Sequence, residues 1–149
     1  MTRDVDLTLL TGFGGEDPFI SALTSEYPSR IPDAAAFARR NRVLLLGTAE
    51  GVGIDISLGA LPFEECVIQR ASLFSFGSGL DIRTCSAEDL VVLKLFASRP
   101  LDIRDAESVV VRQKSLDWGY MEKQLRPLAE AKDDPQILTA LARLRGLQS

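Results

Sequence analysis

Three aspartates in two short apolar segments are the residues best suited to chemistry in this sequence. Asp4 and Asp6 alternate with apolar neighbours, and this period of two predicts a strand from residue 4 to residue 10. Aspartate is disfavoured in strands, and residues two apart share a face, so the two carboxylates are placed to hold one or two divalent cations. Two solvated acids at a strand end would show the same pattern.

Asp55 lies between Ile54 and Ile56 in a second alternating segment, residues 52–58. A carboxylate on an inner strand is unfavourable unless a partner neutralises it. If this strand neighbours the first, three carboxylates converge on one face and call for a cation. Such a trio suits phosphoryl or nucleotidyl transfer. The alternative is an ion pair between Asp55 and an arginine, such as Arg3 or Arg83.

Lys94 stands in the apolar run L-V-V-L-K-L-F-A, followed by Arg99, Asp102 and Asp105. The stem of this lysine is expected to pack while its ammonium group finds an anion or reaches solvent. The arginine and the two aspartates form either part of a site or a capping and salt-bridge cluster between two helices, which would stabilise the fold little.

The elements that must position these residues change character along the chain. The run V-L-L-L in residues 42–47 is typical of a central strand buried on both faces. Ser86 is expected to cap the next helix. The pattern predicts an α+β fold in a single domain, 1–149, with a sheet-rich part (1–85) and a helical part (86–149). Strands are expected at 4–10, 42–47, 52–58, 73–76 and 80–85, and helices at 16–26, 32–40, 62–70, 86–98, 103–113, 116–131 and 135–144.

Composition excludes several classes of protein. The chain of 149 residues contains no histidine, which removes histidine-based catalytic triads and histidine-rich zinc sites. Its net charge of −4 argues against tight non-specific binding of nucleic acid. No apolar run approaches the roughly 20 residues that span a bilayer. We therefore expect a cytoplasmic protein without a membrane partner, and we expect its two cysteines to be reduced.

Three segments together resemble the nucleotidyltransferase superfamily, in the branch that contains the AbiEii-type abortive-infection toxins. They are T-R-D-V-D-L (2–7), D-I-S-L-G-A-L-P-F-E (55–64) and S-A-E-D-L-V-V-L-K-L-F-A-S-R-P-L-D-I-R-D (86–105). The resemblance implies the mixed sheet of that fold and a role in a toxin–antitoxin system. It also implies transfer of a nucleoside monophosphate from a nucleoside triphosphate (NTP) to a hydroxyl acceptor, with Mg²⁺ or Mn²⁺ as cofactor. The acceptor could be RNA, a protein or a small molecule.

The same resemblance implies roles for the candidate residues. Asp4 and Asp6 would be metal ligands, and Asp55 would be a third ligand or the general base. Lys94 would lie near the triphosphate or the acids. Asp105, Asp102 and Arg99 would belong to the downstream acidic motif.

The sequence departs from the superfamily at its front end. Members carry a Gly-Gly or Gly-Ser turn before the Asp-x-Asp strand, and this turn holds the triphosphate, whereas here Met1 lies three residues before Asp4. Either the start codon is misassigned, or the protein is a genuine short form that no longer binds the nucleotide well. Whether the chain is an enzyme therefore stays open. The alternatives are a catalytically degenerate binding or regulatory partner and a phosphohydrolase that uses the same acids. An open sheet edge would let two copies pair as a homodimer.

Overall fold

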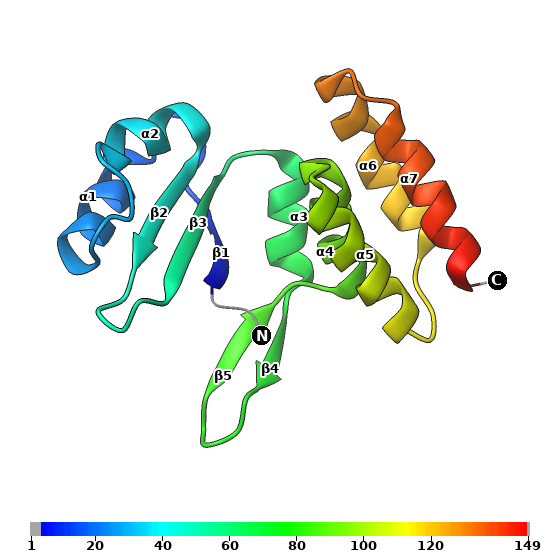
Figure 1. Cartoon of the computed structure of the whole chain (residues 1–149), viewed down its shortest axis with the longest axis horizontal. Helices are drawn as coiled ribbons and strands as arrows, with labels where there is room; N and C mark the ends of the chain where they lie inside the picture. Colours follow the sequence, from blue (N-terminus) through cyan, green and yellow to red (C-terminus); the bar gives the residue numbers. More distant parts are fainter. Residues whose placement is uncertain (1–3, 149) are drawn as a thin grey trace. The chain divides into compact units, whose positions relative to one another are not determined.

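The computed structural model describes residues 4–148 and contains both helices and strands, which confirms the α+β class (Figure 1). The chain divides into two units, Met1–Cys66 and Val67–Ser149. The single-domain organisation stays a prediction. In the described part of the chain, no helix has both the length and the apolar character needed to cross a bilayer.

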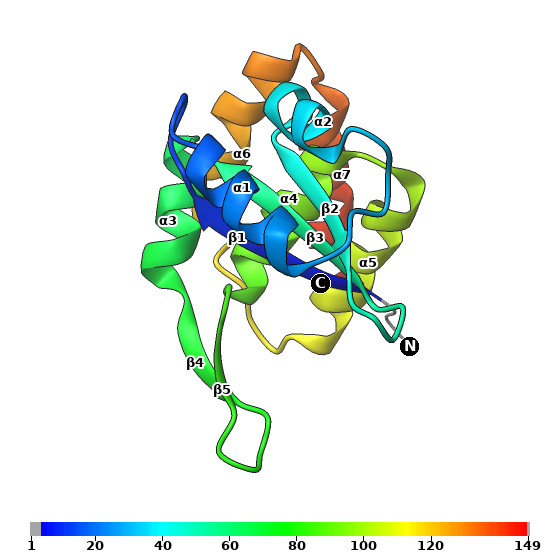
Figure 2. The same ribbon diagram turned by 90° about the vertical axis from the view of Figure 1, so that its left-hand side faces the viewer.

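The first unit is a three-stranded sheet covered on one face by two helices (Figure 2). Its strands are β1 (Asp4–Leu10), β2 (Val43–Gly47) and β3 (Gly53–Gly59), and its helices are α1 (Asp17–Glu26) and α2 (Ala34–Asn41). The order is β1-β3-β2, with β1 parallel and β2 antiparallel to β3. Alternate strand residues form the core with α1 and α2, and the buried members are Ile20, Ala34, Ala38, Leu44, Leu46, Ile56 and Leu58.

The prediction that the 42–47 strand is central was wrong, because β3 occupies the centre and β2 lies at an edge. A run of four apolar residues also suits an edge strand whose outer side is covered by another part of the chain. Here the segment Pro28–Arg30 supplies that cover. The Gly47 amide donates to the Pro28 carbonyl at 2.9 Å, and the Arg30 amide donates to the Leu45 carbonyl at 3.1 Å.

Strand β1 forms the opposite edge of the sheet. Within residues 4–148 no strand pairs with its outer side, and Val5 and Leu7 are 47% and 45% exposed. An unpaired edge with apolar side chains can recruit another strand. Pairing of two copies at this edge stays a prediction.

The second unit is mainly helical. It contains α4 (Ala87–Ala97), α5 (Pro100–Arg112), α6 (Trp118–Lys132), α7 (Gln136–Arg145) and a short 3-10 helix (Gly146–Gln148), while α3 (Pro62–Arg70) runs across the division between the units. The expected cap of α4 is confirmed, because the Asp89 amide donates to the Ser86 hydroxyl at 3.1 Å. Helix α5 begins three residues earlier than expected, at Pro100, since proline is well suited to a first helical turn.

A β-hairpin projects from the helices of this unit (Figures 1 and 2). It consists of β4 (Ser72–Ser75) and β5 (Asp81–Thr84), paired antiparallel with Phe74 opposite Ile82. By alternation one face carries Phe74, Phe76, Leu80 and Ile82. All four side chains are exposed, at 41–59%.

Candidate functional site

The structure brings Asp4, Asp6 and Asp55 onto one face of the first unit's sheet. Asp6 lies directly opposite Asp55 in the parallel β1–β3 pair, and Asp4 lies opposite Gly53. Residues two apart on a strand share a face, so all three carboxylates project from the side opposite the α1–α2 layer. Neighbouring strands are only about 4.8 Å apart, which concentrates negative charge there.

Arg30 is the residue of this face that the sequence did not reveal. Its guanidinium hydrogen-bonds the Asp55 carboxylate, and its Nη1 lies 4.0 Å from an Asp4 oxygen. The structure thus contains the alternative considered for Asp55, an ion pair with an arginine, but the arginine is neither of the two suggested from the sequence. Arg83 instead donates to the Ala71 carbonyl, and Arg3 lies outside the described residues.

The three carboxylates of Asp4, Asp6 and Asp55, called the acidic face from here on, have the right ligand chemistry for a divalent cation. Their side chains are not positioned to coordinate one in this structure. Carboxylate oxygens are the ligands that Mg²⁺ and Mn²⁺ prefer. Among residues 4–148, however, no three acidic, cysteine or histidine side chains are arranged to hold a metal ion. The Arg30 guanidinium takes the position between Asp4 and Asp55 where such an ion would balance the charge. The assignment of these acids as metal ligands stays a prediction.

The second group of predicted residues forms one ionic cluster between α4 and α5. Lys94 Nζ lies 3.3 Å from an Asp102 oxygen and 3.1 Å from an Asp105 oxygen. Arg99 also pairs with Asp102, which is 2% exposed. This is the inter-helix salt-bridge cluster considered from the sequence, but one of its acids is buried.

Burial and ion pairing shift the pKa values of Lys94 and Asp102 in opposite directions. Burial alone would lower the Lys94 pKa, but hydrogen bonds to Asp105 and Asp102 outweigh it and raise the pKa above its ordinary value. Burial alone would raise the Asp102 pKa, but Arg99 and Lys94 together lower it. Both groups are therefore charged near neutral pH. A role for Lys94 near a triphosphate stays a prediction.

A further buried acid, Asp89, lies in the first turn of α4. It is 0% exposed and accepts hydrogen bonds from the Ser86 hydroxyl at 2.8 Å and the Tyr120 hydroxyl at 2.6 Å. Arg70 pairs with it at 3.2 Å and stacks over the Tyr120 ring at 4.0 Å. Burial alone would lower the Arg70 pKa, but Asp89 outweighs it, so the pKa is raised. The cluster joins α3, α4 and α6.

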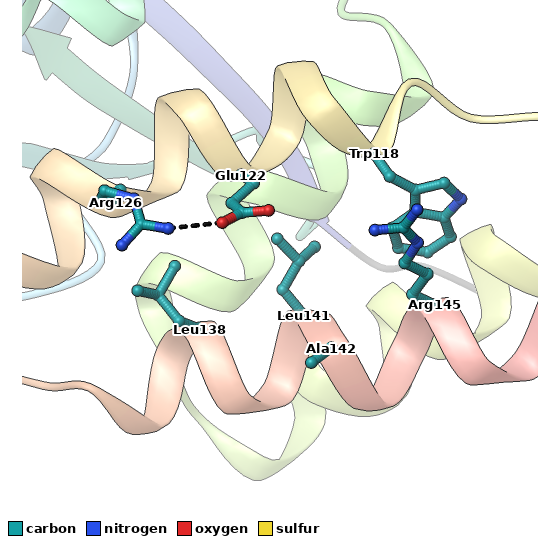
Figure 3. Close-up of a pocket in the computed structure, with 7 residues that line it drawn as sticks. All are labelled: Trp118, Glu122, Arg126, Leu138, Leu141, Ala142 and Arg145. Atoms are coloured by element: carbon teal, nitrogen blue, oxygen red, sulfur yellow. Dashed lines mark hydrogen bonds and ion pairs between the residues drawn. The ribbon is translucent and has the colours of Figure 1, made fainter.

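A small pocket opens between α6 and α7 (Figure 3). It measures about 200 Å³ and is lined by Trp118, Glu122, Arg126, Leu138, Leu141, Ala142 and Arg145. Arg126 pairs with Glu122 at 2.5 Å, and Arg145 lies against Trp118 at the other end. This pocket contains none of the acids predicted to do chemistry.

Comparison with known families bears on the helical segment. Residues 66–137 match a family model described as "Nucleotidyltransferase of unknown function (DUF6036)". The matched segment, a little under half of the chain, contains the Lys94 and Asp89 clusters, whereas Asp4, Asp6 and Asp55 precede it. The match supports the nucleotidyltransferase superfamily. The AbiEii branch stays a prediction. No curated protein matches the chain.

Proposed function

We propose that this protein is a nucleotidyltransferase that moves a nucleoside monophosphate from an NTP to a hydroxyl acceptor at the Asp4, Asp6 and Asp55 face. The observation that supports it best is the register of β1 and β3. This register places Asp6 opposite Asp55, with Asp4 on the same face, although the two segments lie some fifty residues apart. The family match of residues 66–137 agrees with this reaction class.

In this reaction the acceptor oxygen bonds to the α-phosphorus, the bond to the bridging oxygen breaks, and pyrophosphate leaves. A divalent ion bound by Asp4, Asp6 and Asp55 would offset the charge of the triphosphate and make the acceptor hydroxyl more acidic. Asp55 is the more enclosed acid, with a side chain 34% exposed against 52% for Asp4. We assign it as the group that accepts the hydroxyl proton or holds the ion beside it.

The test is nucleotide binding and transfer with and without the acids. Calorimetry with each NTP and Mg²⁺ identifies the nucleotide, and labelled NTP with RNA, protein or small hydroxyl compounds identifies the acceptor. Asp4→Ala with Asp6→Ala is expected to abolish triphosphate binding. The matched control is Asp17→Ala with Glu26→Ala, which removes two acids from α1 and should leave binding intact. Release of phosphate instead of pyrophosphate would identify a phosphohydrolase.

One observation favours a second function, that of a binding or regulatory partner without catalysis, for instance in a toxin–antitoxin pair. Arg30 already pairs with Asp55 and lies close to Asp4, as expected for acids retained for stability. In that case wild-type protein would bind neither NTP nor Mg²⁺ with measurable affinity. Intact triphosphate binding that depends on Asp4 and Asp6 would exclude this alternative.

A further inference from the structure

The backbone of Arg30 is fixed at the edge of the sheet farthest from β1. Ser29 forms an isolated antiparallel bridge with Leu46, and the Arg30 amide donates to the Leu45 carbonyl at 3.1 Å. Both contacts tie the segment to β2. To reach Asp4 on β1, the Arg30 side chain must therefore run across β2 and β3.

A row of residues without side chains provides the path. Gly47 on β2 lies opposite Gly53 on β3, and Gly53 lies opposite Asp4 on β1. A Cβ atom on Gly47 would lie 3.5 Å from the Arg30 Cγ atom. A Cβ atom on Gly53 would lie 2.8 Å from Arg30 Nη1 and would collide with the Asp4 carboxylate. The two glycines thus leave a track over which the stem of Arg30 lies.

At the end of this track the guanidinium meets two of the three acids. Arginine stays charged at every pH of interest and presents five donors in a rigid fork, so it satisfies carboxylates without titrating. The three side chains involved are half-exposed, at 36% for Arg30, 34% for Asp55 and 52% for Asp4. Exposed ion pairs of this kind are weak and exchange readily.

We propose that Arg30 is the resident cation of the acidic face and that it competes directly with divalent ions for Asp4 and Asp55. This inference rests on the proposed function for the choice of acids and adds the residue that controls them. Arg30 keeps the ion-free face neutralised, and a divalent ion binds only when the guanidinium swings away. Metal affinity is then set as much by the strength of the Arg30 pair as by the three carboxylates.

The experiment measures binding of Mn²⁺, without nucleotide, to the full chain. Binding is detected by calorimetry or by the electron spin resonance signal of free Mn²⁺. Arg30→Ala is expected to bind Mn²⁺ about three- to fivefold more tightly than wild type, equivalent to roughly 0.7–1 kcal/mol, the upper part of the range for an exposed ion pair. Arg39→Ala is the matched control, since it lowers the net charge equally but removes an arginine paired with Asp17 on α1 at 2.7 Å. Its Mn²⁺ affinity should stay within about twofold of wild type.

Three further measurements keep the outcome interpretable. Arg30→Gln retains most of the stem over Gly47 and should show the same gain, so it replaces Arg30→Ala if the alanine variant does not fold. Added guanidinium chloride, far below unfolding concentrations, should weaken Mn²⁺ binding by Arg30→Ala more than equal NaCl does, because the free ion refills the vacated place. Asp55→Asn introduced into Arg30→Ala should remove the gain.

The proposal is overturned if Arg30→Ala, or Arg30→Gln in its place, binds Mn²⁺ no better than wild type, or if Arg39→Ala gains as much. Absence of Mn²⁺ binding in every variant overturns it as well. A gain in Mn²⁺ affinity without any NTP transfer would refute the proposed function and leave the role of Arg30 standing. Transfer by wild type without a gain in Arg30→Ala would do the reverse.

Discussion

Each of the two units holds aspartates neutralised by basic side chains, but at different depths. In the first unit the Arg30 and Asp55 side chains are 36% and 34% exposed. In the second, the Asp102 side chain is 3% exposed and its partner Lys94 is 24% exposed. The ion pair of the first unit is therefore formed by two partly exposed side chains, whereas the ion pair of the second unit involves a buried carboxylate.

The difference in depth separates two roles. Removing one partner from a buried pair leaves a charge without solvent, so such a pair holds the fold. An exposed pair stabilises little and can be exchanged for another ion. We infer that the Lys94–Asp102 pair fixes α4 against α5, whereas the Asp4, Asp6 and Asp55 face is free to change partners.

The largest expected effect is the loss of the buried acid. Asp102→Ala removes a buried carboxylate that accepts hydrogen bonds from both Lys94 and Arg99, and it should lower the free energy of unfolding by about 2–3 kcal/mol. Denaturant unfolding should show a lower midpoint with an unchanged slope. Asp105→Ala is the control, because Asp105 pairs with the same lysine but its side chain is 46% exposed. A loss below about 1 kcal/mol is expected there, and equal losses in the two variants would contradict the contrast.

The dependence of stability on pH in the acidic range should also reveal the contribution of Asp102. The Asp102 pKa is lowered in the folded state, so its contribution is fully present above its unfolded pKa of about 3.9 and is lost as pH falls through the lower folded value. The difference in unfolding free energy between wild type and Asp102→Asn should therefore be constant from about pH 5 to 8 and shrink below about pH 4. Urea unfolding at each pH measures it. A difference that grew in acid would mean that the folded-state pKa is raised.

Loss of Arg30 should cost much less stability than loss of Asp102. Arg30→Ala removes an exposed ion pair, so the free energy of unfolding should change by less than about 1 kcal/mol. The measurement is the same denaturant unfolding, with Arg39→Ala as the matched loss of an exposed arginine. A loss as large as that of Asp102→Ala would show that Arg30 is a structural anchor. It would then be no exchangeable cation.

The sequence carried enough information to place each of the three aspartates on a strand face, but not to pair β1 with β3 or to find Arg30. A period of two assigns Asp4, Asp6 and Asp55 to strand faces, and the register then follows from burial of the opposite face. Arg30 lies 25 residues from Asp55, and its role depends on which strand occupies the edge. An apolar run does not distinguish an edge strand from a central one, and the placement of β2 was therefore wrong.

The helical cluster shows the same limit at shorter range. Helical spacing explains why Lys94, Asp102 and Asp105 meet across α4 and α5. It does not say which acid is buried, because that depends on where α5 begins and how it rotates against α4. The Asp89–Tyr120 hydrogen bond spans 31 residues and two helices, so only tertiary packing reveals it.

Added salt should produce the smallest change in energy, but it should separate the Arg30–Asp55 pair most clearly from the Lys94–Asp102 pair. At about 1 M salt the Debye length falls to roughly 3 Å, which screens exposed charges but reaches buried ones poorly. A double-mutant cycle for Arg30 and Asp55 should give a coupling energy of about 0.5–1 kcal/mol at low salt and near zero at high salt. The coupling of Lys94 to Asp102 should keep most of its value under both conditions. If both couplings vanish together, burial does not distinguish the pairs, and the acidic face has no special freedom to exchange Arg30 for a metal ion.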